Sequence, residues 1–574
     1  MNPAQLLNHF DRISEAPDAI SRLRRFILDL AVRGKLVEQD PNEEPARGLL
    51  TRIEAEKAPF VKSGEIRVQE SFDPVKSDEI PFPLPPGWAV TRMGWLARKL
   101  GAGSTPLGEK SVYQNEGVPF LRSQNVHNDG LRLDDVALIS RAIHDRMSGT
   151  HVQQQDILLN ITGASIGRCA LVPITFVEGN VSQHVAIIRL FLPAIRQFIH
   201  LSLTSPFFQK VIDDVQVGVS REGLSMQRLR LFPMLLPPLA EQHRIVTKVD
   251  ELMALCDRLE ATQAERERRR DRLAAASLHR LNQPADRDTP EVFREHARFY
   301  LIHLPRLTTH PDQIKHLRQT ILNLAIRGQL VPQDPSDESG SALLARIQKS
   351  THRSKRSQST SQLSSKAETP SVRFPDSWIS VQIGEVTESI VPQRDKPLTF
   401  TGEIPWVTLP NFREGSLRLH FTCPRLGLSP SEVQQYRLRV VPAGSVLMSC
   451  IGRFGLTALT SEDCIPNQQI HAFCFDPKDL NGRYLCYTIM AQKQYLESES
   501  TTTTISYLNK ARCESMPVSL PPLAEQHRIV ARVDELMAIC DQLETQLTAA
   551  RTESRRLLEA VLHEAITPAA LHTL

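Results

Sequence analysis

The sequence lacks the patterns that mark several large classes of protein. None of its nine cysteines forms a Cys-x-x-Cys pair, which argues against a zinc ribbon or a disulfide framework and favours a reducing compartment. No stretch approaches about 18 uninterrupted apolar residues, so no membrane span is expected. The first twenty residues show no basic segment followed by an apolar run, so no secretory signal is expected either. Together these absences predict a cytoplasmic protein.

Sequence motifs of catalysis are also missing. The chain contains no GxSxG, HExxH or GxGxxG, no Asn/Asp-Pro-Pro-aromatic tetrapeptide of the kind that marks amino-methyltransferases, and no nuclease-like set of carboxylates with a lysine. Residues 103–110 (GSTPLGEK) resemble a P-loop, but Glu109 separates the glycine from the lysine, and no helix-forming run follows. We therefore expect no catalytic residue, no metal site and no bound cofactor in this chain.

Length and charge set further limits. A chain of 574 residues is too long for one hydrophobic core, and its 41% hydrophobic and 23% charged content is typical of globular proteins. The formal net charge is only +3. This value excludes a protein that coats nucleic acid by charge alone, but it allows a reader of nucleic acid whose basic groups are local.

Two internal repeats organise the chain. Residues 236–260 (LPPLAEQHRIVTKVDELMALCDRLE) return at 520–544 with four differences, and residues 22–41 (RLRRFILDLAVRGKLVEQDP) return in similar form at 316–335. We call 22–41 and 316–335 the early elements and 236–260 and 520–544 the late elements. The order is therefore early element, variable block, late element, and then the same three again. Two blocks of divergent sequence on repeated scaffolds indicate one fold used twice to read two different things.

The repeated elements are predicted to be helices. In the second late element, an apolar heptad seam begins at Ile529 and Val533, and the helix should start after Pro522 and run for about 40 residues. In the first copy we expect Leu273 to resume the seam after the charged run 265–272. We interpret that run as a solvated helix face, with a contact to DNA or a subunit as the alternative. His243 and His527 lie within the repeat, where a structural role is favoured.

The early elements are predicted to be shorter helices that end at Gly34 and Gly328. Each has one apolar stripe that needs a partner. We expect the central late element to pack against the central early element, and the last late element to pack against the first early element, which would close the chain into a pseudo-twofold ring. The proline-containing stretch 282–311 should break or turn the chain, residues 58–80 look irregular, and residues 351–370 should be disordered.

The variable blocks combine short strands with helices. Strands are expected within 118–126, 156–172 and 181–190, and within 404–412, 444–460 and 465–475, with a helical stretch after each set. The fold class is therefore α+β, or mixed α/β. Polar and basic side chains that suit base edges and phosphates recur at similar places in the loops of both blocks. An ordinary turn or capping role is the alternative for each of them taken singly. The candidates are Arg122, Ser123, Gln124, Asn125, Asn160, Thr162, Gln183, His184, Ser220 and Arg221, followed by Thr408, Asn411, Arg413, Arg453, Asn467, Gln468, Gln469, Thr502 and Thr503.

The repeated LPPLAEQHRIV, each time before a long helix, resembles the specificity subunits of type I restriction–modification enzymes. FPLPPGW, DILLNITGASIG, IPNQQI and ILDLAVRGKLVEQDP support the resemblance, which covers nearly the whole chain. Block two departs from the pattern, because SCIGRFGLTAL stands where block one has NITGASIGRCAL, with Arg453-Phe454 in place of Ala164-Ser165. The natural interpretation is that block two reads a different half of the DNA target, and the other interpretation is that block two is a weakened domain.

The resemblance implies two target recognition domains, each reading half of a bipartite, asymmetric DNA sequence, joined by antiparallel helices that set the spacer. The expected segments are 1–79 (helical region and linker), 80–235 (first domain), 236–350 (central helices), 351–370 (linker), 371–519 (second domain) and 520–574 (final helix). The resemblance also implies double-stranded DNA, two modification subunits and restriction subunits as partners. S-adenosylmethionine, ATP and Mg²⁺ would be bound by the partner subunits. The rival interpretations are a coiled-coil scaffold that does not touch DNA and a stand-alone methyltransferase or nuclease.

Overall fold

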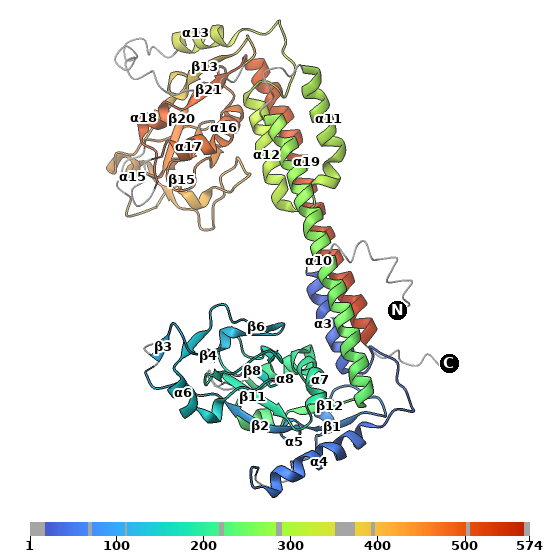
Figure 1. Cartoon of the computed structure of the whole chain (residues 1–574). Coiled ribbons are helices and arrows are strands. Elements are labelled where there is room, and N and C mark those ends of the chain that lie inside the picture. The colour runs from blue at the N-terminus through green and yellow to red at the C-terminus, as the bar shows by residue number, and fades with distance from the viewer. Residues whose placement is uncertain are drawn as a thin grey trace. The chain divides into compact units, whose positions relative to one another are not determined.

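The computed structural model of the chain describes residues 16, 18–66, 72–108, 112–216, 223–282, 290–350, 374–391, 396–500 and 506–566. The chain divides into two compact units. Unit 1 comprises Met1–Arg266 and Arg551–Leu574, and unit 2 comprises Glu267–Ala550. The two long helices α10 (Leu239–Asn282) and α19 (Leu523–Ile566) each begin in one unit and end in the other (Figure 1). Among the described residues, no helix combines the length and apolar character needed to cross a membrane.

Unit 1 contains a mixed domain of short strands and helices. The sheet β2–β11–β8–β9 is antiparallel, whereas β10 pairs with β4 in parallel in the sheet β10–β4–β7–β3. Strand β1 pairs with β12, which leads into α10. The strands are β1 (Ala89–Arg92), β2 (Ala97–Ala102), β3 (Tyr113–Gln114), β4 (Val118–Leu121), β5 (Val126–His127), β6 (Gly130–Leu131), β7 (Ala137–Ile139), β8 (Ile157–Asn160), β9 (Cys169–Leu171), β10 (Asn180–Val181), β11 (Val185–Leu190) and β12 (Pro233–Leu236).

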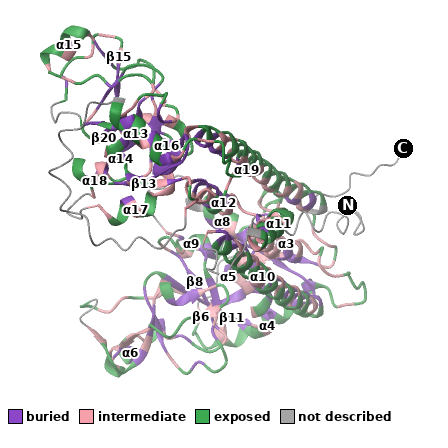
Figure 2. Cartoon of the chain, turned by 90° about the horizontal axis from the view of Figure 1, so that it is seen from above, coloured by how far each residue is buried: buried purple, intermediate pink, exposed green. Residues whose placement is uncertain are grey.

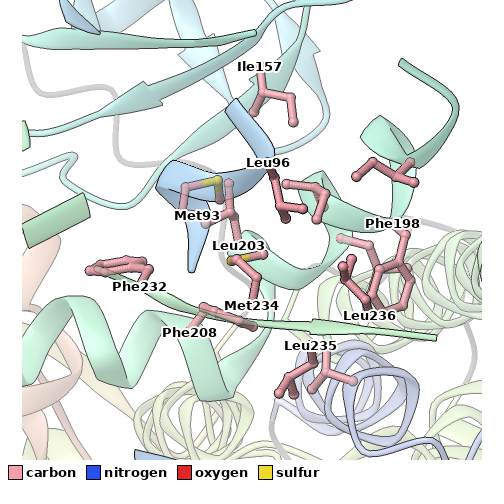
Figure 3. Close-up of a cluster of buried hydrophobic side chains, with 14 of the residues drawn as sticks. Met93, Leu96, Ile157, Phe198, Leu203, Phe208, Phe232, Met234, Leu235 and Leu236 are labelled. Carbon is pink, nitrogen blue, oxygen red and sulfur yellow. The ribbon is translucent and has the colours of Figure 1, made fainter. Parts of the chain in front are cut away.

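The core of this domain is formed by side chains from several elements. Successive residues of β8 and β11 point to opposite faces of their sheet, and both faces are buried (Figure 2). Leu159 and Ile188 lie in one apolar cluster, and Leu158 and Ile187 lie in another. Figure 3 shows Met93 and Leu96, Phe198 and Leu203, and the strand residue Met234 converging on one apolar cluster. The helices are α3 (Ala19–Val32), α4 (Ala46–Lys62), α5 (Met93–Leu96), α6 (Arg141–Arg146), α7 (Arg196–Thr204), α8 (Pro206–Gln216) and α9 (Met226–Arg230).

Unit 2 repeats this arrangement. The sheet β14–β20–β17–β18 corresponds to β2–β11–β8–β9, the parallel pair β15–β19 corresponds to β4–β10, and β13–β21 corresponds to β1–β12. Its strands are β13 (Ile379–Gln382), β14 (Glu388–Ile390), β15 (Ile404–Val407), β16 (Gly427–Leu428), β17 (Val446–Ser449), β18 (Thr457–Leu459), β19 (Ile465–Pro466), β20 (Ile470–Cys474) and β21 (Pro517–Leu520). Its helices are α11 (Pro290–Leu307), α12 (Pro311–Ile326), α13 (Gly340–Ser350), α14 (Ile383–Val386), α15 (Pro430–Gln435), α16 (Gly482–Ala491), α17 (Lys493–Ser498) and α18 (Lys510–Glu514). The predicted strand segments of both blocks therefore all contain strands.

The same polar joint ties each domain to its long helix. The indole N–H of Trp88 donates to Glu241 Oε1 at 3.0 Å, and Gln39 donates to the same oxygen at 2.8 Å. In unit 2, Trp378 and Gln333 donate to Glu525 at 2.9 and 2.5 Å. Glu241 and Glu525 are both 1% exposed, and burial raises the pKa of each carboxyl above its ordinary value. The joint accounts for the acidic residue of the repeated LPPLAEQ.

The early helices pack as the ring hypothesis predicts, but they also make a second set of contacts. The end of α10 contacts α12 through Asn282 and Thr320 (2.9 Å), and the end of α19 contacts α3 through Glu559 and Arg22 (2.7 Å). These are the predicted pairings. In addition, Arg24 pairs with Asp257 on α10 at 2.6 Å, so each early helix also packs against the long helix of its own half.

In unit 2 the directions of these helices follow from the contacts. Arg318 pairs with Asp541 at 2.6 Å, and Gln333 reaches Glu525, so α12 and the chain after it run antiparallel to α19. Gln313 donates to Asp271 at 2.7 Å while Asn282 reaches Thr320, so α12 runs parallel to the end of α10. The end of α10 is therefore antiparallel to α19, as predicted for the repeated helices.

Three local predictions need correction. Leu273 does not resume the seam of α10, because it is 46% exposed and the buried positions are Ala274, Leu278 and Leu281. A strict heptad carried on from Ile245 reaches residue 273, but an α-helix drifts by roughly 20° per heptad against that repeat, so after four heptads residue 274 takes the buried position. The stretch 282–311 does interrupt the chain, because α10 ends at Asn282 and α12 begins at Pro311, but it also contains helix α11, whose first position is Pro290, where a proline costs no hydrogen bond. Helix α4 extends to Lys62, into a region expected to be irregular. Residues 351–370 lie outside the described residues.

Candidate nucleic-acid interface

The first predicted contact region is a turn braced by an asparagine, here called the asparagine turn (122–125 and 408–411). Asn125 Oδ1 accepts the backbone N–H of Arg122 at 2.9 Å, and its Nδ2 donates to the Arg132 carbonyl at 2.9 Å. Asn411 accepts the N–H of Thr408 at 2.7 Å and donates to the His420 carbonyl at 2.9 Å. Both asparagine side chains are therefore engaged within the protein, where they hold the turn in shape.

The side chains around the first asparagine turn are more accessible. Gln124 is exposed, and Ser123 and Arg122 are half-buried. The Arg122 guanidinium lies over the Tyr113 ring, 5.6 Å from its centroid, which orients the group by a cation–π contact. Of these residues, Gln124 and Arg122 have the chemistry to contact a base or a phosphate.

The second region is the glycine turn (161–168 and 450–456). Gly163 and Gly167 have φ values of 78° and 85°, a backbone conformation that residues with a Cβ atom rarely adopt. Asn160, which is fully buried before this turn, donates to the Ser123 carbonyl at 2.8 Å and so connects it to the asparagine turn. Thr162 lies within the turn, and its hydroxyl is 2.5 Å from His184 Nδ1.

The glycine turn is one residue shorter in unit 2. The Asn160 N–H reaches the Arg168 carbonyl at 2.8 Å, whereas the Ser449 N–H reaches the Leu456 carbonyl at 3.0 Å. Phe454 is buried in the core of its domain, so the departure from the family-like pattern places an aromatic side chain in the core. Arg453 is exposed, and its guanidinium lies 3.9 Å from Glu414.

The third region is the glutamine turn (182–184 and 467–469). The N–H of Ser182 donates to the Leu121 carbonyl and that of Asn467 to the Val407 carbonyl, both at 2.9 Å. Gln183 and Gln468 occupy the corresponding exposed positions of the two turns. Each turn is thus fixed by backbone bonds, which leaves a glutamine amide at its surface.

The remaining predicted residues divide into two groups. His184 and Arg413 are exposed, whereas Thr408, Asn467 and Gln469 are half-buried, and Asn467 accepts the N–H of Gln469 at 3.1 Å. Ser220, Arg221, Thr502 and Thr503 lie outside the described residues. The backbone contacts of the three turns bring the other candidates of each domain together at one edge, where β8 and β17 end.

Two residues at this edge were not among the predicted contacts. Arg168 closes the first glycine turn and is exposed. Tyr507 is 44% exposed, and its backbone forms a bridge with Ile451. The sequence held a signal for both, since Arg168 belongs to the GASIGR segment and Tyr507 follows the threonine run.

The chemistry of this edge is that of hydrogen bonding and local charge. Amide, guanidinium and hydroxyl groups line it in both units. Within the described parts of the chain, no group of three or more His, Cys, Asp or Glu side chains is placed to hold a metal ion. All nine cysteines are free thiols, and burial raises the pKa of Cys450 to about 11 and that of Cys464 to about 12, which leaves these thiols protonated at neutral pH.

The comparisons with known proteins agree with the repeat. The family model described as "Type I restriction modification DNA specificity domain" matches residues 85–266 and 375–550. The chain is 28% identical to the type I restriction enzyme EcoEI specificity subunit of Escherichia coli, over 95% of this chain and 94% of that protein. It is 27% identical to the EcoAI specificity subunit of the same species, with the same coverage. A crystal structure of the HsdS subunit from Thermoanaerobacter tengcongensis covers 85% of this chain and 98% of its own, at 20% identity and a TM-score of 0.44.

The fold and its two edges define a protein with two copies of one α+β domain, carried on helices that repeat in the same order along the chain. The two matches of the family model cover more than half of the sequence. The chain belongs to the type I restriction–modification DNA specificity family, and its function is that of a DNA sequence-specificity subunit with two recognition domains.

Proposed function

We propose that each unit reads one half of a bipartite, asymmetric DNA target through its three turns. One observation carries this proposal: the two edges share the same backbone contacts but present different side chains. Gln124, Arg168 and His184 belong to the first edge, and Arg413 and Arg453 to the second. A shared frame with different exposed donors and acceptors is suited to two different base sequences.

The recognition domains are proposed to comprise residues 80–235 and 371–519, with the repeated helices 1–79, 236–350 and 520–574 between and around them. Gln183, Gln468, Arg122, Arg413 and Arg453 are the proposed contacts to bases and phosphates. Asn125, Asn160 and Asn411 are proposed to shape the turns, because their amides already have partners within the protein.

The chain is further proposed to act in the cytoplasm as a non-catalytic subunit. Its partners would be two modification subunits, which bind S-adenosylmethionine and methylate adenine, and restriction subunits, which use ATP and Mg²⁺. The names of the relatives, specificity subunits of type I restriction enzymes, support this assembly. The absence of recognisable catalytic motifs from the sequence agrees with it.

Methylome sequencing of the host, with and without this gene, tests the proposal directly. We expect one bipartite adenine-methylated motif to disappear with the gene. A gel shift of the chain with its modification subunits on duplexes carrying that motif, and on random duplexes, then measures discrimination. A coiled-coil scaffold would show no DNA binding even with those subunits, and a stand-alone methyltransferase would transfer methyl groups without them.

A further inference from the structure

Each domain exposes one leucine more fully than any other large apolar side chain among its described residues. Leu107 is 97% exposed and Leu398 is 87% exposed. Both occupy the connection that follows the first strand of the antiparallel sheet, after β2 in unit 1 and after β14 in unit 2. Both follow a proline, although the rest of the two connections, GSTPLGEK and QRDKPLTF, shares little. A single exposed leucine is ordinary, but an exposed Pro-Leu kept in two divergent loops calls for a common contact.

In unit 1, this connection is anchored beside the candidate interface at both ends. At its start, Gly103 N–H donates to the Val185 carbonyl at 2.9 Å and Ser104 N–H to the Val181 carbonyl at 3.1 Å, so the loop leaves the sheet next to the glutamine turn. A Cβ on Gly103 would lie only 2.1 Å from the Val181 carbonyl oxygen, which shows how closely the chains approach. At its return, Tyr113 carries the Arg122 guanidinium over its ring.

The connection in unit 2 has a comparable anchor. Strand β14 ends with Ile390 paired to Ala472, just beyond the second glutamine turn. Farther along, the N–H of Leu398 donates to the Tyr436 hydroxyl at 3.3 Å, and Thr399 donates to Glu432 at 2.6 Å. The backbone at Leu398 is thus tied down while its side chain points away from the protein. The preceding prolines reduce the conformational freedom that each loop would lose on binding.

We propose that Leu107 and Leu398 are DNA contacts, one in each domain, that place an apolar side chain against the base-pair stack. This rests on the proposed function. Proteins that distort DNA insert leucine and similar side chains between base steps, and such a contact depends little on base identity. That explains why the pair is kept while the polar contacts diverge. A docking site for another protein would instead need a contiguous apolar surface, and the neighbours of Leu107 are Ser104, Thr105, Pro106 and Gly108.

The test uses the chain assembled with its modification subunits and a duplex carrying the cognate motif, with 2-aminopurine at successive steps to report unstacking. We expect Leu107→Ser and Leu398→Ser each to weaken binding about tenfold, roughly 1.4 kcal/mol, and to reduce the 2-aminopurine signal within one half-site. Leu107→Met and Leu398→Met should keep both. The matched controls are Val177→Ser and Leu426→Ser, which replace residues that are 87% and 50% exposed and should leave binding unchanged.

Two results would overturn the inference. One is that the serine variants at 107 and 398 bind DNA and unstack it as the controls do. The other is that these variants lose modification subunits during purification while their remaining complexes bind normally, which would assign the leucines to a protein contact. Failure of the proposed function is distinguishable from both, because the unmodified complex would then fail to discriminate the motif from random DNA.

Discussion

Trp88 and Glu241 are joined across 3.0 Å by a hydrogen bond from the indole to a carboxylate that is 1% exposed, and Trp378 and Glu525 are joined in the same way across 2.9 Å. The tryptophan belongs to the entrance of a recognition domain, and the glutamate to the first turn of a long helix. Gln39 and Gln333 complete the two joints from the chain that follows each early helix. One buried carboxyl therefore connects each domain both to its long helix and to the chain after the early helix.

Removing this acceptor should cost more than neutralising it. Glu241→Ala leaves the buried indole N–H of Trp88 without its acceptor and removes the contact with Gln39, so we expect about 2 kcal/mol of destabilisation. Glu241→Gln keeps an oxygen at the same place and should be close to neutral. Thermal melts of the two variants, with the corresponding pair at Glu525, measure the difference. Equal losses for alanine and glutamine would show that the charge, and not the acceptor, stabilises the joint.

The same carboxyls should make stability depend on pH. Burial raises the pKa of Glu241 and Glu525 above the ordinary value of 4.5, so the folded state holds protons that the unfolded state releases. The stability that these two protonated carboxyls contribute is fully present below pH 4.5 and is lost as the pH rises through their raised pKa values in the folded state. We therefore expect the melting temperature of the wild type to fall, relative to the Glu241→Gln/Glu525→Gln variant, as the pH rises from 4.5 to 8. Parallel pH profiles for the two proteins would contradict this.

Gly34 should resist substitution for two reasons that can be separated. Its φ is 65°, and an added Cβ would lie 2.4 Å from Pro85 Cγ. Gly64 has a similar φ of 74° but nothing within 4 Å of the added atom. We expect Gly64→Ala to cost about 1 kcal/mol for the backbone alone, and Gly34→Ala to cost clearly more. Chemical denaturation of both variants tests this, and equal costs would mean that Pro85 moves aside.

The two glutamine turns should affect different halves of the target. Gln183→Ala is expected to relax discrimination within one half-site by about 1–3 kcal/mol, and Gln468→Ala within the other. Binding of the assembled complex to duplexes with a single changed base pair in either half measures this. Asn125→Ala and Asn411→Ala serve as controls that disturb the turn itself. Uniform weakening on all sequences by the glutamine variants would assign Gln183 and Gln468 to a backbone or structural role.

The sequence predicted the repeated scaffold well because its signals are local and duplicated. Pro521 and Pro522 precede the final helix, Gly34 and Gly328 take the left-handed conformation after the early helices, and Cys256 and Cys540 are buried in the helix seams. Proline, glycine and apolar periodicity each act within a few residues, so they can be interpreted without tertiary information.

The interface was harder to predict because exposure depends on long-range contacts. Asn160 and Gln183 are both polar residues beside strands, yet the structure buries Asn160 against the carbonyl of Ser123, 37 positions away, and leaves Gln183 at the surface. Leu273 failed as a seam residue because a strict heptad repeat drifts by roughly 20° per heptad against an α-helix, and four heptads separate it from Ile245. Helix α11 was missed because its proline was interpreted as a breaker when it stands at the start of the helix.

The duplicated joint has an evolutionary consequence. Tryptophan, glutamate and glutamine meet in the same way in both units. A recombination event that exchanges the segment between the entrance tryptophan and LPPLAEQ would therefore place a foreign recognition domain on a joint that already fits it. The flanking repeats also supply the homology that recombination needs. With the joint kept, a change of recognition domain requires no change in the helices that carry it.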